Sequence, residues 1–123
     1  MDYLLTKLFH LVGIMLLFLG LGVMLIVSTL EPGDARKRII RLSALLHGFG
    51  LVFILISGIA MLNSLGFLHG DPPGWVKAKF GIFLILAFAL TFAKRLRLPV
   101  WVLLGSWGLL GVAAAYLALY KPF

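Results

Sequence analysis

The chain of 123 residues contains no cysteine and only four acidic residues. Without thiols it can form no disulfide, thiolate metal site, iron–sulfur cluster or covalent c-type haem linkage. The carboxylates all fall outside or at the edge of the apolar runs: Asp2, Glu31, Asp34 and Asp71. A carboxylate-based proton path or a carboxylate-bound metal inside a membrane is therefore excluded within one chain.

Combinations of a nucleophile with a matching base are also lacking. A serine nucleophile needs a histidine base that an acid orients, as in the Ser-His-Asp arrangement. None of Ser43, Ser57 and Ser106 has such an acid-oriented histidine. We therefore predict no hydrolase chemistry and assign no catalytic residue.

Apolar side chains dominate what is present. Hydrophobic residues make up 63% of the chain and charged residues 12%, with a mean hydropathy of +1.14. A soluble domain of this length could not bury so much apolar surface. The segments 8–28 and 100–120 each contain no Asp, Glu, Lys or Arg and reach the roughly 20 residues that cross a bilayer. We therefore predict an integral membrane protein whose first partner is the lipid bilayer.

Four membrane-spanning helices follow from the positions of helix breakers. Pro32 and Gly33 end the first apolar run, and Pro72 and Pro73 separate the second from the third. Short connections make neighbouring helices antiparallel. The sequence thus predicts an all-α protein, a single domain over 1–123 that forms an up-down-up-down bundle. Its helices are expected at about 3–28, 39–65, 75–93 and 99–120.

Basic residues predict the orientation in the membrane. Seven lie on the side of the 29–41 and 94–98 loops: Arg36, Lys37, Arg38, Arg41, Lys94, Arg95 and Arg97. Four lie on the other side: Lys7, Lys77, Lys79 and Lys121. Because cytoplasmic loops are rich in Lys and Arg, we expect these two loops on the cytoplasmic side of the cell membrane and both termini on its outer side. The formal charge of +7 then reflects orientation, and no nucleic-acid partner is expected.

Glycines recur at spacings that suit close helix contacts. Gly105, Gly108 and Gly111 follow one face of the last helix, and such small-residue faces let helix backbones approach each other in lipid. Gly13 and Gly20 in the first helix, with Gly50 and Gly58 in the second, offer similar grooves. We expect the Gly105/Gly108/Gly111 face to bind a second copy of the chain or another membrane subunit.

Three ionisable groups are expected inside the membrane, where such groups are costly and often functional. His10 lies about seven residues into the first span and Lys79 about four into the third, roughly 10 Å and 6 Å from the same outer face. These two side chains can converge on one site. His47 enters from the opposite face of a core about 30 Å thick and should miss His10 by roughly 10 Å. A haem held between the two histidines is therefore not expected.

Each of these groups also has a purely structural interpretation. Lys77, beside Trp75, is expected to anchor the chain at the membrane interface. Lys79 could equally extend to the interface or serve a site. His10 could equally bind a metal or hydrogen-bond to another helix, while His47 is expected to hydrogen-bond to a neighbouring carbonyl.

Three short segments carry a family resemblance: "KLFHLVG" at 7–13, "GWVKAKFGIFLIL" at 74–86 and "YKPF" at 120–123. They are similar to the Lys-x-x-His opening, the Gly-Trp-x-x-x-Lys start of helix three and the Lys-Pro-Phe ending of HemJ-type protoporphyrinogen oxidases. Small CopD-like and SirB-like membrane proteins have a similar Lys-x-x-His opening. The resemblance implies a haem b with His10 as its axial metal ligand, and Trp75 and Lys79 lining the same outer-side site.

The chain departs from that family in its polar segments. Where HemJ-like proteins carry polar motifs in helices two to four, this chain has "SALLHGFGLV", "LAFALTFAKR" and "GSWGLLGVAA". We therefore predict a small non-catalytic membrane protein, a scaffold or accessory subunit of a larger assembly. The alternative is a haem b- or porphyrin-binding redox protein of the HemJ-like type, which would be a membrane oxidoreductase.

Overall fold

Five α-helices make up the secondary structure of the described residues. A computed structural model describes residues 2–27, 29–95 and 98–123, and this part of the chain is all-helical and contains no strand. The chain divides into two compact units, Met1–Gly70 and Asp71–Phe123. Each unit is a helical hairpin, and each is described by itself.

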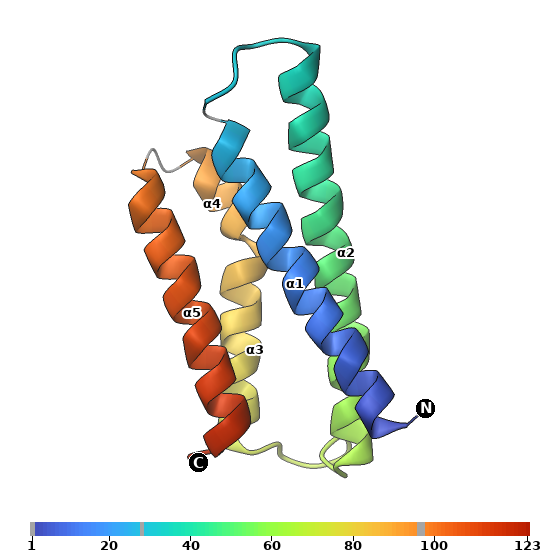
Figure 1. Ribbon diagram of the computed structural model, residues 1–123. Coiled ribbons are helices and arrows are strands. Elements are labelled where there is room, and N and C mark those ends of the chain that lie inside the picture. Colours follow the sequence, from blue (N-terminus) through green and yellow to red (C-terminus); the bar gives the residue numbers. More distant parts are fainter. Residues whose placement is uncertain (1, 28, 96–97) are drawn as a thin grey trace. The chain divides into compact units, whose positions relative to one another are not determined.

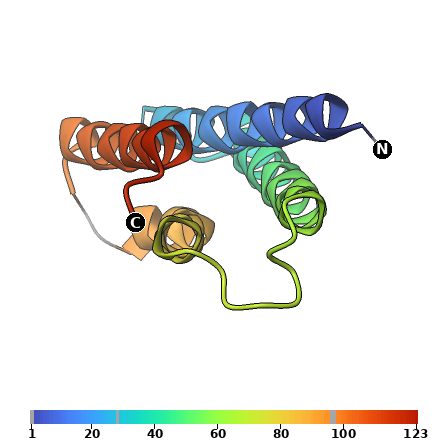
Figure 2. The ribbon, with the colours of Figure 1, turned by 90° about the horizontal axis from the view of Figure 1, so that it is seen from below.

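The first unit consists of α1 (Tyr3–Val27) and α2 (Asp34–Ser64). The two helices run antiparallel and lie against each other at an angle (Figures 1 and 2). The buried residues of α1 include Gly13, Leu17 and Gly20. Those of α2 are Ser43, His47, Gly50 and Ser57. Spacings of three, four and seven residues put each set on one side of its helix.

Glycines bring the two backbones into direct contact. A Cβ at Gly20 would lie 2.6 Å from the backbone nitrogen of His47, and one at Gly50 would lie 2.5 Å from that of Leu17. A Cβ at Gly13 would lie 2.8 Å from the Cβ of Phe53. These distances are shorter than van der Waals contact, so only glycine fits at these three positions. The predicted close contacts at Gly13, Gly20 and Gly50 are therefore confirmed.

One hydroxyl group links the helices beside this contact. The fully buried Ser43 donates a hydrogen bond from its Oγ to the carbonyl oxygen of Gly20, at 2.7 Å. Interhelical hydrogen bonds of this kind contribute on average about 0.6 kcal/mol in a membrane. The bond therefore adds modestly to the glycine contact and specifies which residues face each other.

The ends of α2 differ in how well the sequence predicted them. Its start at Asp34 corrects the predicted start near residue 39, because an acidic first residue and the helix-favouring Ala, Arg and Lys that follow extend the helix. Only 29–33 of the predicted 29–41 loop is non-helical among the described residues. The end near Leu65 is as predicted. Gly66 adopts φ 79°, and the Phe67 and Gly66 amides donate to Leu62 and Asn63 in a Schellman motif.

The second unit contains α3 (Gly74–Ala87), α4 (Ala89–Arg95) and α5 (Val100–Tyr120). Helix α5 lies antiparallel to α3 (Figure 1). The prediction of one continuous helix over 75–93 is wrong, because Phe88 (φ −91°, ψ 0°) separates α3 from α4. The hydrogen-bond series continues across it, since the Phe88 amide donates to Leu84 and the Phe92 amide to Phe88. No Pro or Gly marks the break.

Some predicted boundaries fall at residues without a described structure. Ser28, the predicted end of the first helix, lies outside the described residues, and α1 ends at Val27. In the predicted 94–98 loop, 96 and 97 also lie outside them, while the backbone of 94–95 belongs to α4. The last helix starts at Val100 directly after Pro99, as a proline at a helix start favours.

Within the described residues, three helices are long and apolar enough to cross a membrane: α1, α2 and α5. Large apolar side chains on them are exposed within the chain, such as Met15 at 67%, Ile56 at 64% and Leu109 at 72%. Exposed apolar surface on this scale is unfavourable in water, whereas lipid solvates it. The protein is therefore a membrane-embedded helical protein.

The glycine contact can be tested with two matched pairs of substitutions. We expect Gly20→Ala and Gly50→Ala to destabilise the protein by about 1–3 kcal/mol, the usual cost of overpacking. Gly22→Ala and Gly48→Ala are the controls on the same helices, because a Cβ there meets no described atom within 4 Å. Unfolding by SDS in mixed micelles, followed by circular dichroism, measures the difference. Equal stability of all four variants would contradict the close contact.

Candidate functional site

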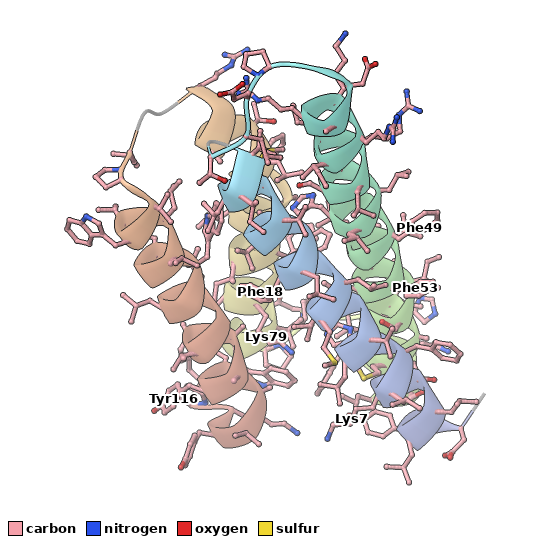
Figure 3. The ribbon with its side chains drawn as sticks, turned by 45° about the horizontal axis from the view of Figure 1, so that its top comes forward. Lys7, Phe18, Phe49, Phe53, Lys79 and Tyr116 are labelled. Atoms are coloured by element: carbon pink, nitrogen blue, oxygen red, sulfur yellow. The ribbon has the colours of Figure 1, made fainter. Side chains whose placement is uncertain are left out.

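His10 is held between the two helices of the first unit. Its Nδ1 lies 2.9 Å from the Oγ of Ser57, and its ring packs beside Gly58, where a Cβ would lie 3.6 Å from the His10 Cε1. Phe53, labelled on α2 in Figure 3, packs edge-on against Phe9 with ring centroids 6.3 Å apart. The interhelical hydrogen bond, one of the two interpretations of His10, is thus present.

The Ser57 hydroxyl selects the tautomer of this imidazole. The Ser57 Oγ also hydrogen-bonds to the carbonyl oxygen of Phe53 one turn earlier. A carbonyl only accepts, so the hydroxyl hydrogen points to Phe53 and the Oγ accepts the hydrogen bond from Nδ1–H of His10. The lone pair of the neutral ring is then on Nε2. Metal-binding histidines usually have this arrangement: one ring nitrogen donates a hydrogen bond, and the other nitrogen keeps the lone pair that binds the metal.

The Ser57–His10 hydrogen bond is not a hydrolytic pair. The hydroxyl hydrogen is directed to a backbone carbonyl, whereas a serine nucleophile must direct it to the histidine. All four carboxylates of the chain are exposed and lie outside the helices or at a first turn.

His47 is buried at a different level of the same hairpin. It is 4% exposed, and its backbone nitrogen and Cβ face Gly20. His10 instead lies beside Ser57 and Gly58, so ten residues of either helix separate the two levels, roughly 15 Å at 1.5 Å per residue. This spacing agrees with the predicted separation of the two histidines.

The start of α3 and the end of the chain form one cluster in the second unit. The amide of Trp75 donates to the carbonyl oxygen of Phe123 at 3.0 Å, and the Lys121 Nζ lies 5.3 Å from the centroid of the Trp75 ring. The Phe123 ring occupies the space that a Cβ at Gly74 would need. Two segments of the family resemblance, "GWVKAK" and "YKPF", therefore meet in space.

The lysines of α3 differ in their surroundings. Lys77 forms an exposed ion pair with Asp71, at 2.7 Å between Nζ and Oδ1, a type of contact that contributes little to stability. Lys79 is half-buried on the same helix, and Tyr116 lies on the neighbouring α5 (Figure 3). Lys77 thus has the environment of a group at the aqueous boundary.

The predicted site residues fall in both units. His10 belongs to the first unit, whereas Trp75 and Lys79 belong to the second, so their convergence on one site stays a prediction. Sequence reasoning missed the role of Ser57. The available signal was a serine seven residues after Gly50 on the glycine-bearing face of α2, where a hydroxyl can reach the facing helix.

Comparisons with protein-family models, with curated proteins and with solved structures found no match. Within the described residues, no group of three or more His, Asp or Glu side chains could hold a metal ion.

The role of Ser57 can be tested by comparing two serines of α2. We expect Ser57→Ala to remove the Nδ1–H tautomer preference of His10, visible in the 15N chemical shifts of the imidazole, and to cost about 0.6 kcal/mol. Ser64→Ala is the control, because the exposed Ser64 makes the same type of bond to the backbone four residues earlier and contacts no histidine in a described hydrogen bond. Unchanged imidazole shifts in Ser57→Ala would contradict the assignment.

Proposed function

We propose that the protein is a non-catalytic accessory subunit of a larger membrane assembly. The observation that supports this most is the glycine face of α5. Gly105 and Gly108 are exposed, and a Cβ at either position would meet no described atom of the second unit within 4 Å. In the first unit, by contrast, a Cβ at Gly13, Gly20 or Gly50 would overlap atoms of the facing helix.

This face differs from the side of α5 that is buried. Leu103 and Trp107 are the buried residues of the helix. Successive residues are rotated by about 100° around the helix axis. The middle of the face formed by Gly105, Gly108 and Gly111 is therefore rotated by more than 90° from the buried side. Lipid tails give no hydrophobic drive for helix association, so close backbone approach at small residues supplies much of it. The Gly105/Gly108/Gly111 face is therefore the surface for a second copy or another membrane subunit.

The proposed topology has four membrane crossings. Helices α3 and α4 together cover 74–95, roughly 33 Å at 1.5 Å per residue, enough to cross a hydrocarbon core of about 30 Å. With α1, α2 and α5 this makes an up-down-up-down arrangement. The excess of basic residues on the 29–41 and 94–98 side favours a cytoplasmic location for that side and an outer location for both termini.

A second candidate function rests on His10. The Ser57 hydrogen bond leaves the lone pair of the neutral ring on Nε2, the state in which a histidine binds haem iron. Haem b would supply one-electron redox chemistry, and the chain would supply the axial ligand and its orientation. In this function Trp75 and Lys79 would line the porphyrin site, with the Lys79 ammonium beside the propionates.

The accessory role predicts that bulk on the glycine face disrupts association. We expect Gly108→Leu to release the partner subunit, or the second copy, in blue-native electrophoresis of detergent-solubilised membranes. Ala113→Leu is the control, because Ala113 is an exposed small residue on another side of α5. A wild-type chain that migrates alone in mild detergent, with nothing co-purifying, would contradict the accessory role.

The haem-binding alternative predicts an absorption spectrum. The purified chain, expressed with ample haem, should then show a Soret band and sharp α and β bands after dithionite reduction. We expect His10→Ala to abolish these bands and Ser57→Ala to weaken haem binding about 10- to 100-fold. His69→Ala, in an exposed loop, is the control. A wild-type spectrum that contains only the aromatic absorption would reject this candidate.

A further inference from the structure

A groove lies on one flank of the α1–α2 hairpin, at the end that carries the 29–33 connection. Its volume is about 460 Å³, within the range of about 300–1,000 Å³ that ligand-binding cavities have. Apart from one guanidinium group its lining is apolar, with Val23, Ile26 and Leu30 on one side and Ile39 and Leu42 on the other. The groove lies at least 13 residues along α1 from His10, roughly 20 Å, and is separate from that candidate site.

The charged member of the lining is Arg38. Arg36 and Arg41 lie within one turn of it, and the acidic Glu31 and Asp34 nearby are exposed. The Nε of Arg36 is enclosed and has no hydrogen-bond partner among the described residues. Arg36 and Arg41 are not part of the groove lining. They add positive charge to this end of the hairpin, while Arg38 places a guanidinium group in the groove itself.

The length of α2 places these groups at the edge of the bilayer. The helix has 31 residues, roughly 46 Å, whereas the hydrocarbon core is about 30 Å thick. Its first eight residues, which include Arg36, Arg38 and Arg41, therefore extend into the headgroup region. From Arg38 the apolar lining continues to Val23 on α1 and Leu42 on α2, toward the middle of both helices and so toward the hydrocarbon.

We infer that this groove binds one anionic phospholipid. The phosphate accepts hydrogen bonds from the guanidinium of Arg38, and one acyl chain lies along Ile26, Ile39 and Leu42. The charge of the lining favours an anionic headgroup over a zwitterionic one, since each nearby arginine adds to the attraction. The apolar depth of the groove favours a lipid over a free phosphate.

The experiment is native mass spectrometry of the full chain in a mild non-ionic detergent. The probes are phosphatidylglycerol and phosphatidylcholine with identical acyl chains. We expect the wild type to retain one phosphatidylglycerol molecule, at least about fivefold more strongly than phosphatidylcholine, which is the effect of roughly one arginine at a membrane surface. Glycerol 3-phosphate at the same concentration should not compete, because it lacks the acyl chains.

Two substitutions separate the charge from the apolar groove. Arg38→Gln should lower phosphatidylglycerol retention about fivefold, and Ala35→Phe should lower it by filling the groove, which Ala35 also lines. Lys37→Gln is the matched control: it removes the same charge from an exposed residue on the opposite side of α2 and should retain the lipid as the wild type does. Circular dichroism checks that each variant is folded.

Three results would overturn the inference. Equal losses in Arg38→Gln and Lys37→Gln would mean that only the net charge matters. Competition by glycerol 3-phosphate would mean that the groove binds a phosphate without the lipid. Retention of neither lipid, together with a dimer that Ala35→Phe disrupts, would mean that a second copy of the chain covers the groove.

Discussion

The contact between the backbones of α1 and α2 is the constraint on which the first unit depends. In lipid, two apolar helices gain little by leaving the solvent, so they associate through close van der Waals contact and interhelical hydrogen bonds. Gly13, Gly20 and Gly50 provide that contact because a Cβ at any of them would overlap the facing helix. Ser43 adds a hydrogen bond to the Gly20 carbonyl at the same level. The register that results brings Ser57 opposite His10.

The same register separates the chemically active groups along the hairpin. His10 lies near one end beside Ser57, His47 is buried opposite Gly20, and Arg38 lines a groove at the other end. Because a helix rises 1.5 Å per residue, Arg38 lies roughly 14 Å along α2 from His47, and the level of His10 lies roughly 15 Å beyond His47. One small ligand cannot span two of these levels. Each level of the hairpin therefore has its own chemistry: a histidine of defined tautomer, a buried histidine against a glycine, and an arginine beside an apolar groove.

The second unit is stabilised in a different way. The last residues contact the start of α3 through the backbone hydrogen bond from Trp75 to Phe123 and the cation–π contact between Lys121 and Trp75. The Phe123 ring also packs against Gly74. Lys121 adopts a left-handed conformation (φ 46°) that ends α5 and turns the last residues toward α3. Gly105 and Gly108 of α5 lie outside this contact, and a Cβ at either position would meet no described atom within 4 Å.

Composition and helix breakers alone determined that the protein is helical and embedded in a membrane, because apolar runs of about 20 residues leave no other stable state. They also determined that α1 ends before Pro32 and that α2 ends near Leu65. The break at Phe88 depended on the tertiary structure, since no Pro or Gly marks it. Among the glycines of the apolar helices, the structure likewise decided that Gly20 and Gly50 contact the facing helix and that a Cβ at Gly105 or Gly108 meets no described atom within 4 Å. The Ser57–His10 hydrogen bond joins residues 47 apart in the sequence. Helical periodicity predicts which residues share one face of a helix, but only the tertiary structure decides which residues of another helix pack against that face.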